Sequence, residues 1–207
     1  MGAVDLATGN VERAGKLYQQ ALEVFTRVGV RWEMANCVNG LAEVARLSDD
    51  LEAAERGYLR ALELYDSVTH ADAVVARLNL GLVRLRRGDY AGTAAVAEEA
   101  REAGERYDRP RFHAAAHCML LAVAGAEGRW DAWDEHYRVA RQLLDETGHA
   151  EADNGWCAWL AGTFAEEVGD VERARDAWEL GWSQYEALDD EVHTAELEQR
   201  IAQLPRG

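Results

Sequence analysis

Several features are scarce in this sequence of 207 residues, and each scarcity narrows the possible folds. Only two prolines occur, Pro110 and Pro205, so the long stretches on either side of Pro110 are free to be helical. No run of about 18 apolar residues is present, which argues against a membrane-spanning helix. The chain does not open on a basic segment followed by an apolar one, so we expect no signal peptide.

Cysteine and lysine are rare as well. Cys37, Cys118 and Cys157 are odd in number and fall within helical stretches, which predicts reduced, buried thiols in a cytoplasmic protein. Lys16 is the single lysine, and this excess of arginine, with abundant alanine, fits a GC-rich bacterial genome. The net charge of −16 predicts that neither nucleic acid nor an anionic membrane is bound, because both attract positive surfaces. The same charge favours a basic or mixed partner surface.

Catalytic motifs are also missing. Neither G-x-S-x-G nor H-E-x-x-H occurs, and the G-K-L sequence at 15–17 lacks the glycine spacing and the Ser/Thr of a phosphate loop. His113, His117 and Cys118 form H-x-x-x-H-C, but no third and fourth metal ligand is evident nearby, which favours packing between helices over metal binding. The other histidines, His136 among them, are interpreted as surface residues. We therefore predict no enzymatic activity, no cofactor and no metal site.

One stretch, residues 39–65, sets the pattern for the rest of the chain. It divides into two amphipathic halves at Asp49-Asp50, and either aspartate can cap the second helix. The second half carries apolar or small side chains at helical spacing, namely Leu51, Ala54, Tyr58, Ala61, Leu62 and Tyr65. Two helices with one apolar face each cannot bury both sides alone, so such a unit needs neighbours.

The polar turn of this unit recurs at spacings of 40, 39, 40 and 41 residues. The five turns are Gly9-Asn10, Asp49-Asp50, Gly88-Asp89, Gly128-Arg129 and Gly169-Asp170. A small residue is expected five positions after the turn, an aromatic one at nine and a small one at twelve. The fifth unit fits this pattern with Ala174, Trp178 and Gly181. In the fourth, Leu121 and Trp133 replace small residues, so we expect its two helices to splay apart.

This small–aromatic–small pattern and the Gly-Asp turn resemble the second helix of the tetratricopeptide repeat (TPR), and Leu80-Gly81 resembles its first helix. The usual TPR period is 34 residues, so at about 40 each helix should be roughly one turn longer. The sequence GLAEVARL…DLEAAERGYLRALELY is similar to the C-terminal tails of bacterial serine/threonine kinases and of large ATP-dependent transcriptional regulators. The resemblance implies an all-α, right-handed α-solenoid of ten or eleven antiparallel helices.

We expect a single repeat domain over residues 1–207, without internal linkers. Its predicted segments are a partial repeat at 1–28, full repeats at 29–68, 69–107, 108–147 and 148–188, and a capping helix at 190–204. Because the first repeat is partial, Leu17, Val24 and Phe25 should form an exposed apolar edge. This predicts either a chain cut from a larger protein or one whose N-terminal edge is covered by something else, and a homodimer through that edge when the chain is isolated.

The TPR resemblance also implies a binding groove lined by the first helix of each repeat. Mapping the TPR groove positions onto this chain selects Asn36, Asn39, Glu43, Arg46, Leu78, Leu82, Arg86, Cys118, Trp156 and Trp159. The predicted function is a protein–protein interaction scaffold that binds a protein or peptide segment, as the regulatory tail of a larger bacterial signalling protein. The alternative is a small-ligand sensor or cofactor-free enzyme that uses an apolar pocket near Trp156 and Trp159.

Overall fold

The computed structural model describes residues 10–65 and 73–205 of the chain. Within these ranges it contains ten α-helices and no strand, which confirms the predicted all-α class. The chain divides into two compact units, residues 1–89 and 90–207, and each is described by itself. The expected boundary between the second and third repeats, at 68 and 69, lies outside the described residues. None of the described helices is long and apolar enough to cross a membrane.

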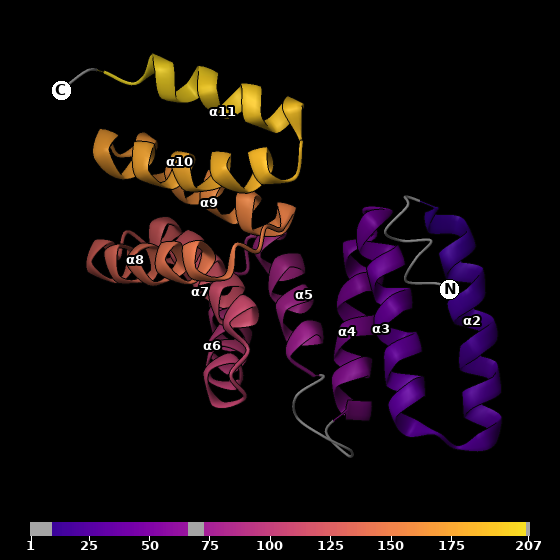
Figure 1. The fold of residues 1–207 in the computed structure, drawn as a ribbon. Coiled ribbons are helices and arrows are strands. Elements are labelled where there is room, and N and C mark those ends of the chain that lie inside the picture. The colour runs from indigo at the N-terminus through magenta and orange to yellow at the C-terminus, as the bar shows by residue number, and fades with distance from the viewer. Residues whose placement is uncertain (1–9, 66–72, 206–207) are drawn as a thin grey trace. The chain divides into compact units, whose positions relative to one another are not determined.

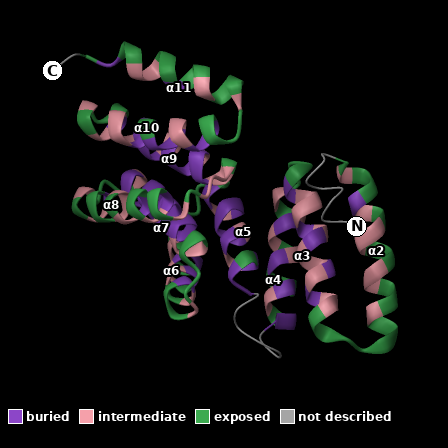
Figure 2. Cartoon of the chain, viewed as in Figure 1, coloured by how far each residue is buried: buried purple, intermediate pink, exposed green. Residues whose placement is uncertain are grey.

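The described part of unit 1, residues 1–89, contains helices that pack against their neighbours in sequence (Figure 1). They are α2 (Val11–Val28), α3 (Arg31–Leu47), α4 (Leu51–Tyr65) and α5 (Ala73–Arg86). The pair α3 and α4 contains the organising stretch recognised in the sequence, and its helices begin and end where the polar turn predicts. Figure 2 shows that α2 remains largely exposed or half-buried, with Ala14 as its one buried residue.

Unit 2, residues 90–207, continues with six helices. They are α6 (Tyr90–Arg106), α7 (Pro110–Ala126), α8 (Trp130–Thr147), α9 (Ala152–Glu167), α10 (Val171–Ala187) and α11 (Glu191–Gln203). The core of the unit is α7, in which every residue from 114 to 125 is buried because α6, α8 and α9 all pack against it. At the other end α11 packs on α10 with Leu197 buried and most of its surface exposed, as expected of a capping helix.

The repeated polar turn has one backbone geometry. Its first residue adopts the left-handed conformation at Asp49, Gly88, Gly128 and Gly169, with φ between 61° and 81°. Its second residue precedes the next helix, and Asp50 accepts a hydrogen bond from the backbone N–H of Ala53. A further copy, Asp189-Asp190, begins α11 with the same geometry. The sequence analysis did not recognise that copy as a turn of this kind, because it follows the previous one by only 20 residues.

The small–aromatic–small pattern marks the contacts between paired helices, as predicted. Tyr58 and Trp178 are fully buried. The rings of Trp178 and Tyr18 lie where the opposite helix carries a glycine. A Cβ built on Gly162 would overlap the indole of Trp178, and one on Gly40 would overlap the ring of Tyr18. Small residues are therefore required on the helix that faces the aromatic side chain, as well as beside it in sequence.

The expected splay of the fourth hairpin is wrong. The helices α7 and α8 remain in close contact along their length, as α3 and α4 do. Trp133 is fully buried, and its Cδ1 would lie 3.5 Å from a Cβ built on Gly125. Gly125 thus provides the space that Leu121 does not, and the bulk of Trp133 is accommodated one turn further along α7.

Candidate functional site

The predicted groove residues of α3 form one polar stripe. Asn36, Asn39, Glu43 and Arg46 follow each other at helical spacing, which places their side chains on one side of the helix. Two of them bind tyrosines of α4. The hydroxyl of Tyr65 donates to Oδ1 of Asn36 at 2.6 Å, and the hydroxyl of Tyr58 donates to Oε2 of Glu43 at 2.5 Å. The sequence analysis identified the stripe but not these tyrosine partners.

Glu43 is the centre of a largely buried ionic network. Arg46 donates to both carboxylate oxygens, from Nε at 3.0 Å and from Nη2 at 2.6 Å. Burial raises the pKa of Glu43, but the hydrogen bonds and charge of Arg46, helped by Tyr58 and Arg86, hold that pKa below its usual value. Burial, reinforced by the carboxylate of Glu43, raises the pKa of Tyr58. Glu43 is therefore a carboxylate and Tyr58 a neutral donor at neutral pH.

Asn39 differs from its neighbours on the stripe. Its side-chain Oδ1 is buried and has no hydrogen-bond partner within the described ranges. A buried acceptor without a donor costs free energy that a bound N–H group would recover. The asparagine lies between Asn36 and Glu43, whose oxygens are already bonded, so the oxygen of Asn39 is the unsatisfied acceptor of the stripe.

The remaining predicted groove residues divide into two groups. Leu78 and Leu82 in α5 and Cys118 in α7 belong to the core, with 6%, 3% and 0% of their surfaces exposed. Burial raises the pKa of the Cys118 thiol to about 12, so this cysteine is unreactive. Arg86, by contrast, acts electrostatically on Glu43 and so lies near the α3 stripe. In unit 1, the structure thus brings Arg86 together with the stripe and places the two leucines beneath the surface.

In unit 2, the predicted residues Trp156 and Trp159 line one cavity, of about 150 Å³. We call it the aromatic cavity; its lining comprises Trp156, Trp159, Tyr185, His193, Glu196 and Leu197. His193 of α11 stacks on Tyr185 of α10, with ring centroids 4.6 Å apart and an interplanar angle of 17°. A pocket near the two tryptophans was expected from the sequence, but the lining residues that α11 contributes were not.

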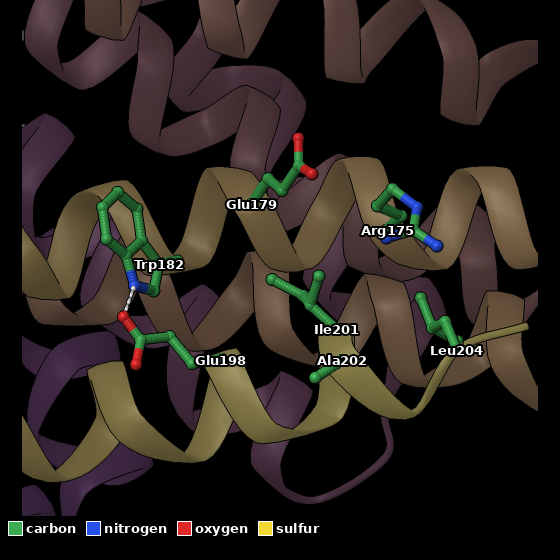
Figure 3. Close-up of a pocket in the computed structure, with 7 residues that line it drawn as sticks. All are labelled: Arg175, Glu179, Trp182, Glu198, Ile201, Ala202 and Leu204. Carbon is green, nitrogen blue, oxygen red and sulfur yellow. Dashed lines mark hydrogen bonds between the residues drawn. The ribbon is translucent and has the colours of Figure 1, made fainter. Parts of the chain in front are cut away.

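A second and larger cavity, of about 370 Å³, lies between α10 and α11 (Figure 3). Glu179 and Trp182 of α10 line it together with Ile201 and Ala202 of α11, and the indole Nε1 of Trp182 donates to Glu198 at 3.2 Å. The sequence analysis missed this cavity. Its only signal was the spacing of Trp182 one turn after the buried Trp178, which does not reveal how α11 would lie.

The histidine motif of α7 acquires an unexpected member. His117 lies between two other imidazoles, with its Nε2 3.2 Å from Nε2 of His113 and its Nδ1 3.1 Å from Nδ1 of His136. His136 was interpreted as a surface residue, and that is wrong, because α8 turns it toward α7. Burial, helped by the neighbouring histidines, lowers the pKa of His117 to about 3. No group of three or more His, Cys, Asp or Glu in the described ranges is placed to hold a metal ion.

The predicted apolar edge lies on α2. Val24 is 46% exposed, whereas Leu17 and Phe25 are half-buried. Residues 1–9, which precede this edge, lie outside the described residues. The edge is thus exposed at Val24 and neighbouring Val28, and more covered than expected at the other two positions.

Comparisons with known proteins agree on one architecture. A tetratricopeptide-repeat family model matches residues 1–67. Among solved structures, BtubC (BKLC) from P. vanneervenii is 16% identical with a TM-score of 0.63, over 93% of this chain and 90% of that one. YrrB, described as a TPR protein with an unusual peptide-binding site, is 15% identical with a TM-score of 0.56, over 96% and 88%. The chain has a TPR-like α-solenoid fold.

A third solved structure has a similar fold. It is a Rap protein complexed with Competence and Sporulation Factor, 16% identical to this chain with a TM-score of 0.67. The match covers 97% of this TPR-like chain and 60% of the Rap chain. A search of curated proteins found no match. The predicted fold class is therefore confirmed, whereas the resemblance to kinase and regulator tails stays a prediction.

Proposed function

We propose that this TPR-like chain is an interaction scaffold that binds a segment of another protein. One contact region is the polar stripe of α3 with Arg86, in unit 1; another is the pair Trp156 and Trp159, in unit 2. The observation that carries the proposal is the buried, unpartnered Oδ1 of Asn39 on the α3 stripe. An extended segment offers backbone N–H groups, and one such group satisfies this acceptor.

The ionic network supports the same assignment. The hydrogen bonds that fix Glu43 through Arg46 and Tyr58 hold this side of α3 in one arrangement before a partner arrives. A preorganised polar surface binds without losing side-chain entropy. Two structural neighbours, YrrB and the Rap complex, are described by their titles as having a peptide-binding site and as complexed with a factor, respectively.

The setting that we propose is a regulatory role in a bacterial signalling protein. The sequence similarity to the tails of kinases and regulators supports this role. The net charge of −16 favours a basic partner segment. The alternative, a small-ligand sensor or cofactor-free enzyme, requires a pocket for the whole ligand. The aromatic cavity, at about 150 Å³, is below the roughly 300–1,000 Å³ of typical small-molecule sites, so the pocket near Trp156 and Trp159 does not support this alternative.

The test begins with selection of peptides from a displayed library on the intact chain, followed by calorimetric titration of the selected peptide. Asn39→Leu removes the acceptor and should weaken binding at least tenfold. The same change should leave stability unchanged or raise it, because an unpartnered buried acceptor disappears. Gln142→Leu changes an exposed amide of α8 in the same way, and this matched control should not alter binding. Equal affinities for the two variants would contradict the proposal.

Self-association through α2 is a separate proposal, supported by the exposure of Val24 and Val28. An exposed apolar strip on a helix favours pairing with a second copy in a two-fold dimer. Sedimentation velocity over a range of concentrations tests it. A Val24→Glu variant should shift the chain toward the monomer, and a chain that is monomeric at high micromolar concentration would contradict the dimer.

A further inference from the structure

The aromatic cavity has a composition suited to one class of ligand. Four of its six lining side chains are aromatic, and Glu196 is the one carboxylate among the six. Aromatic faces attract cations through the negative potential above the ring, most strongly when the site also excludes water. A carboxylate at the rim adds direct charge attraction. The chemistry that fits these walls is therefore an organic cation.

The size of the cavity restricts that cation further. A volume of about 150 Å³ is too small for a cofactor-sized ligand and is suited to one side-chain head group. Leu197, the buried residue of α11, lines the cavity and gives it an apolar patch against which an alkyl stem can pack. An alkyl stem ending in an ammonium or guanidinium group is the description of a lysine or arginine side chain.

A guanidinium of the chain itself already lies over Trp159, which lines the cavity, and over the neighbouring Trp178. The Cζ of Arg200 lies 5.2 Å from the ring centroid of Trp159 and 5.5 Å from that of Trp178. Arg200 also contacts two carboxylates, Glu196 at 3.4 Å and Glu166 at 3.7 Å. This cluster therefore keeps one more negative than positive charge. Because its ion pairs are partly exposed and weak, Glu196 remains available to a second cation.

The wall formed by α11 is fixed in position. Nδ1 of His193 lies 2.7 Å from Oδ2 of Asp190, and the imidazole stacks on Tyr185. Asp190 also caps α11 by accepting from the backbone N–H of His193. The ring is thus held at the cavity by one hydrogen bond to Asp190 and by the stacking contact with Tyr185.

We infer that the aromatic cavity binds the cationic head of a lysine or arginine side chain carried by the partner segment. The inference rests on the proposed function for the identity of the partner, and it adds a requirement: the segment contains a basic residue that enters between Trp156 and Glu196. The net charge of −16 favours the same kind of segment over the whole chain.

The experiment uses small probes, so that the cavity is tested without any partner protein. The intact chain is labelled with ¹⁵N, and the indole N–H signals are assigned with single Trp→Phe variants. The probes are the N-acetyl, N′-methylamide derivatives of lysine and arginine, the norleucine derivative as an apolar match, and choline as a free cation. The lysine or arginine probe should shift the signals of Trp156 and Trp159 to saturation, and norleucine should not.

Two variants of α11 provide the matched comparison. Glu196→Gln removes the carboxylate at the cavity and should weaken binding of the basic probe at least fivefold. Glu198→Gln makes the same charge change two residues away, beside Trp182 and the other cavity, and should leave binding unchanged. Both side chains are exposed, and thermal melts check that the two variants fold equally well.

Three results would overturn the inference. Equal shifts with norleucine would make the cavity an apolar one. Equal affinities of the two glutamine variants would remove the role of Glu196. Saturable binding of choline with none of the basic amino-acid probes would assign the cavity to a free small cation. The proposed function is judged separately, because Asn39→Leu tests the α3 stripe and leaves the aromatic cavity unchanged.

Discussion

The indole ring of Trp178 in α10 lies directly against Gly162 in α9, so close that a Cβ on the glycine would overlap the ring. The ring is also fixed by a hydrogen bond, from its Nε1 to the carbonyl oxygen of Trp159 at 3.0 Å. Neither residue can move without the other. This pair shows how the two helices of a hairpin pack, with one large ring in the space that a small residue leaves on the opposite helix.

Gly162→Ala should therefore destabilise the chain, by about 1–3 kcal/mol, even though alanine has the higher helix propensity. The measurement is the free energy of unfolding in urea. A double-mutant cycle with Trp178→Leu provides the control, because the smaller side chain makes room for the methyl group. The alanine should cost clearly less in that background, and an equal cost in both backgrounds would show that the ring and the glycine do not interact.

The ionic network on α3 predicts unequal costs for two ion pairs of the same spacing. Glu43→Ala leaves the buried Arg46 without its main partner and should cost about 3 kcal/mol. Glu135→Ala breaks the pair with Arg138, also three residues apart but about 60% exposed, and should cost less than about 1 kcal/mol. Chemical denaturation at pH 7 measures both. Similar losses would mean that Arg46 is paired equally well without Glu43.

The three neighbouring histidines predict a loss of stability in mild acid. Burial lowers the pKa of His117 to about 3, while in the unfolded chain the same imidazole titrates near its ordinary value of about 6.5. Between these values the unfolded state binds more protons, so stability falls as the pH decreases through about 6.5 and continues to fall toward 3. The pKa values of His113 and His136 are also lowered by burial, and these residues act in the same direction.

The variant His117→Gln should flatten this dependence, since glutamine fills similar space without titrating. Urea midpoints measured between pH 7.5 and pH 5 provide the comparison, and His149→Gln at the α8–α9 turn serves as a control with a half-buried imidazole outside the histidine cluster, 2.7 Å from Glu151. A parent chain with constant midpoints over this range, or a His117→Gln chain with the same slope, would contradict the assigned burial.

The left-handed turn residues predict opposite effects for two substitutions. Gly169 has φ of 81°, so Gly169→Ala should destabilise by about 1–2 kcal/mol through the strain of a side chain there. Asp49 has φ of 61° in the equivalent position, and Asp49→Gly should relieve strain and cost nothing or stabilise slightly. Thermal melts compare the two. A stabilising Gly169→Ala would refute the shared turn geometry.

Much of the fold follows from local sequence. The paired turn residues mark the end of α3 and the starts of α4, α6 and α10, because a left-handed residue followed by a cap stops one helix and starts the next. The small–aromatic–small spacing identifies the core positions for the same physical reason, since close helix contacts require alternating bulk. The fate of Trp133 was not predictable, because the space it occupies is provided by Gly125, on the opposite helix.

Less of the candidate site than of the fold could be predicted from the sequence. The α3 stripe follows from helical spacing, but its tyrosine partners depend on the exact packing of α4. Leu78 and Leu82 were mapped from a shorter repeat, and in the longer helices of this chain those positions belong to the core. The position of His136 depends on the rotation of α8 about its own axis, for which the sequence carries no local signal.

The role of Asn39 as the acceptor for a bound segment is the central claim, and one measurement tests it directly. The side-chain amide signal of Asn39 is followed by NMR during titration with a selected peptide, with Asn39→Gln to assign the signal. The account predicts a shift that saturates at the dissociation constant measured by calorimetry. Saturated binding with that signal unmoved, while signals elsewhere on the chain shift, would contradict the account and place the binding surface away from α3.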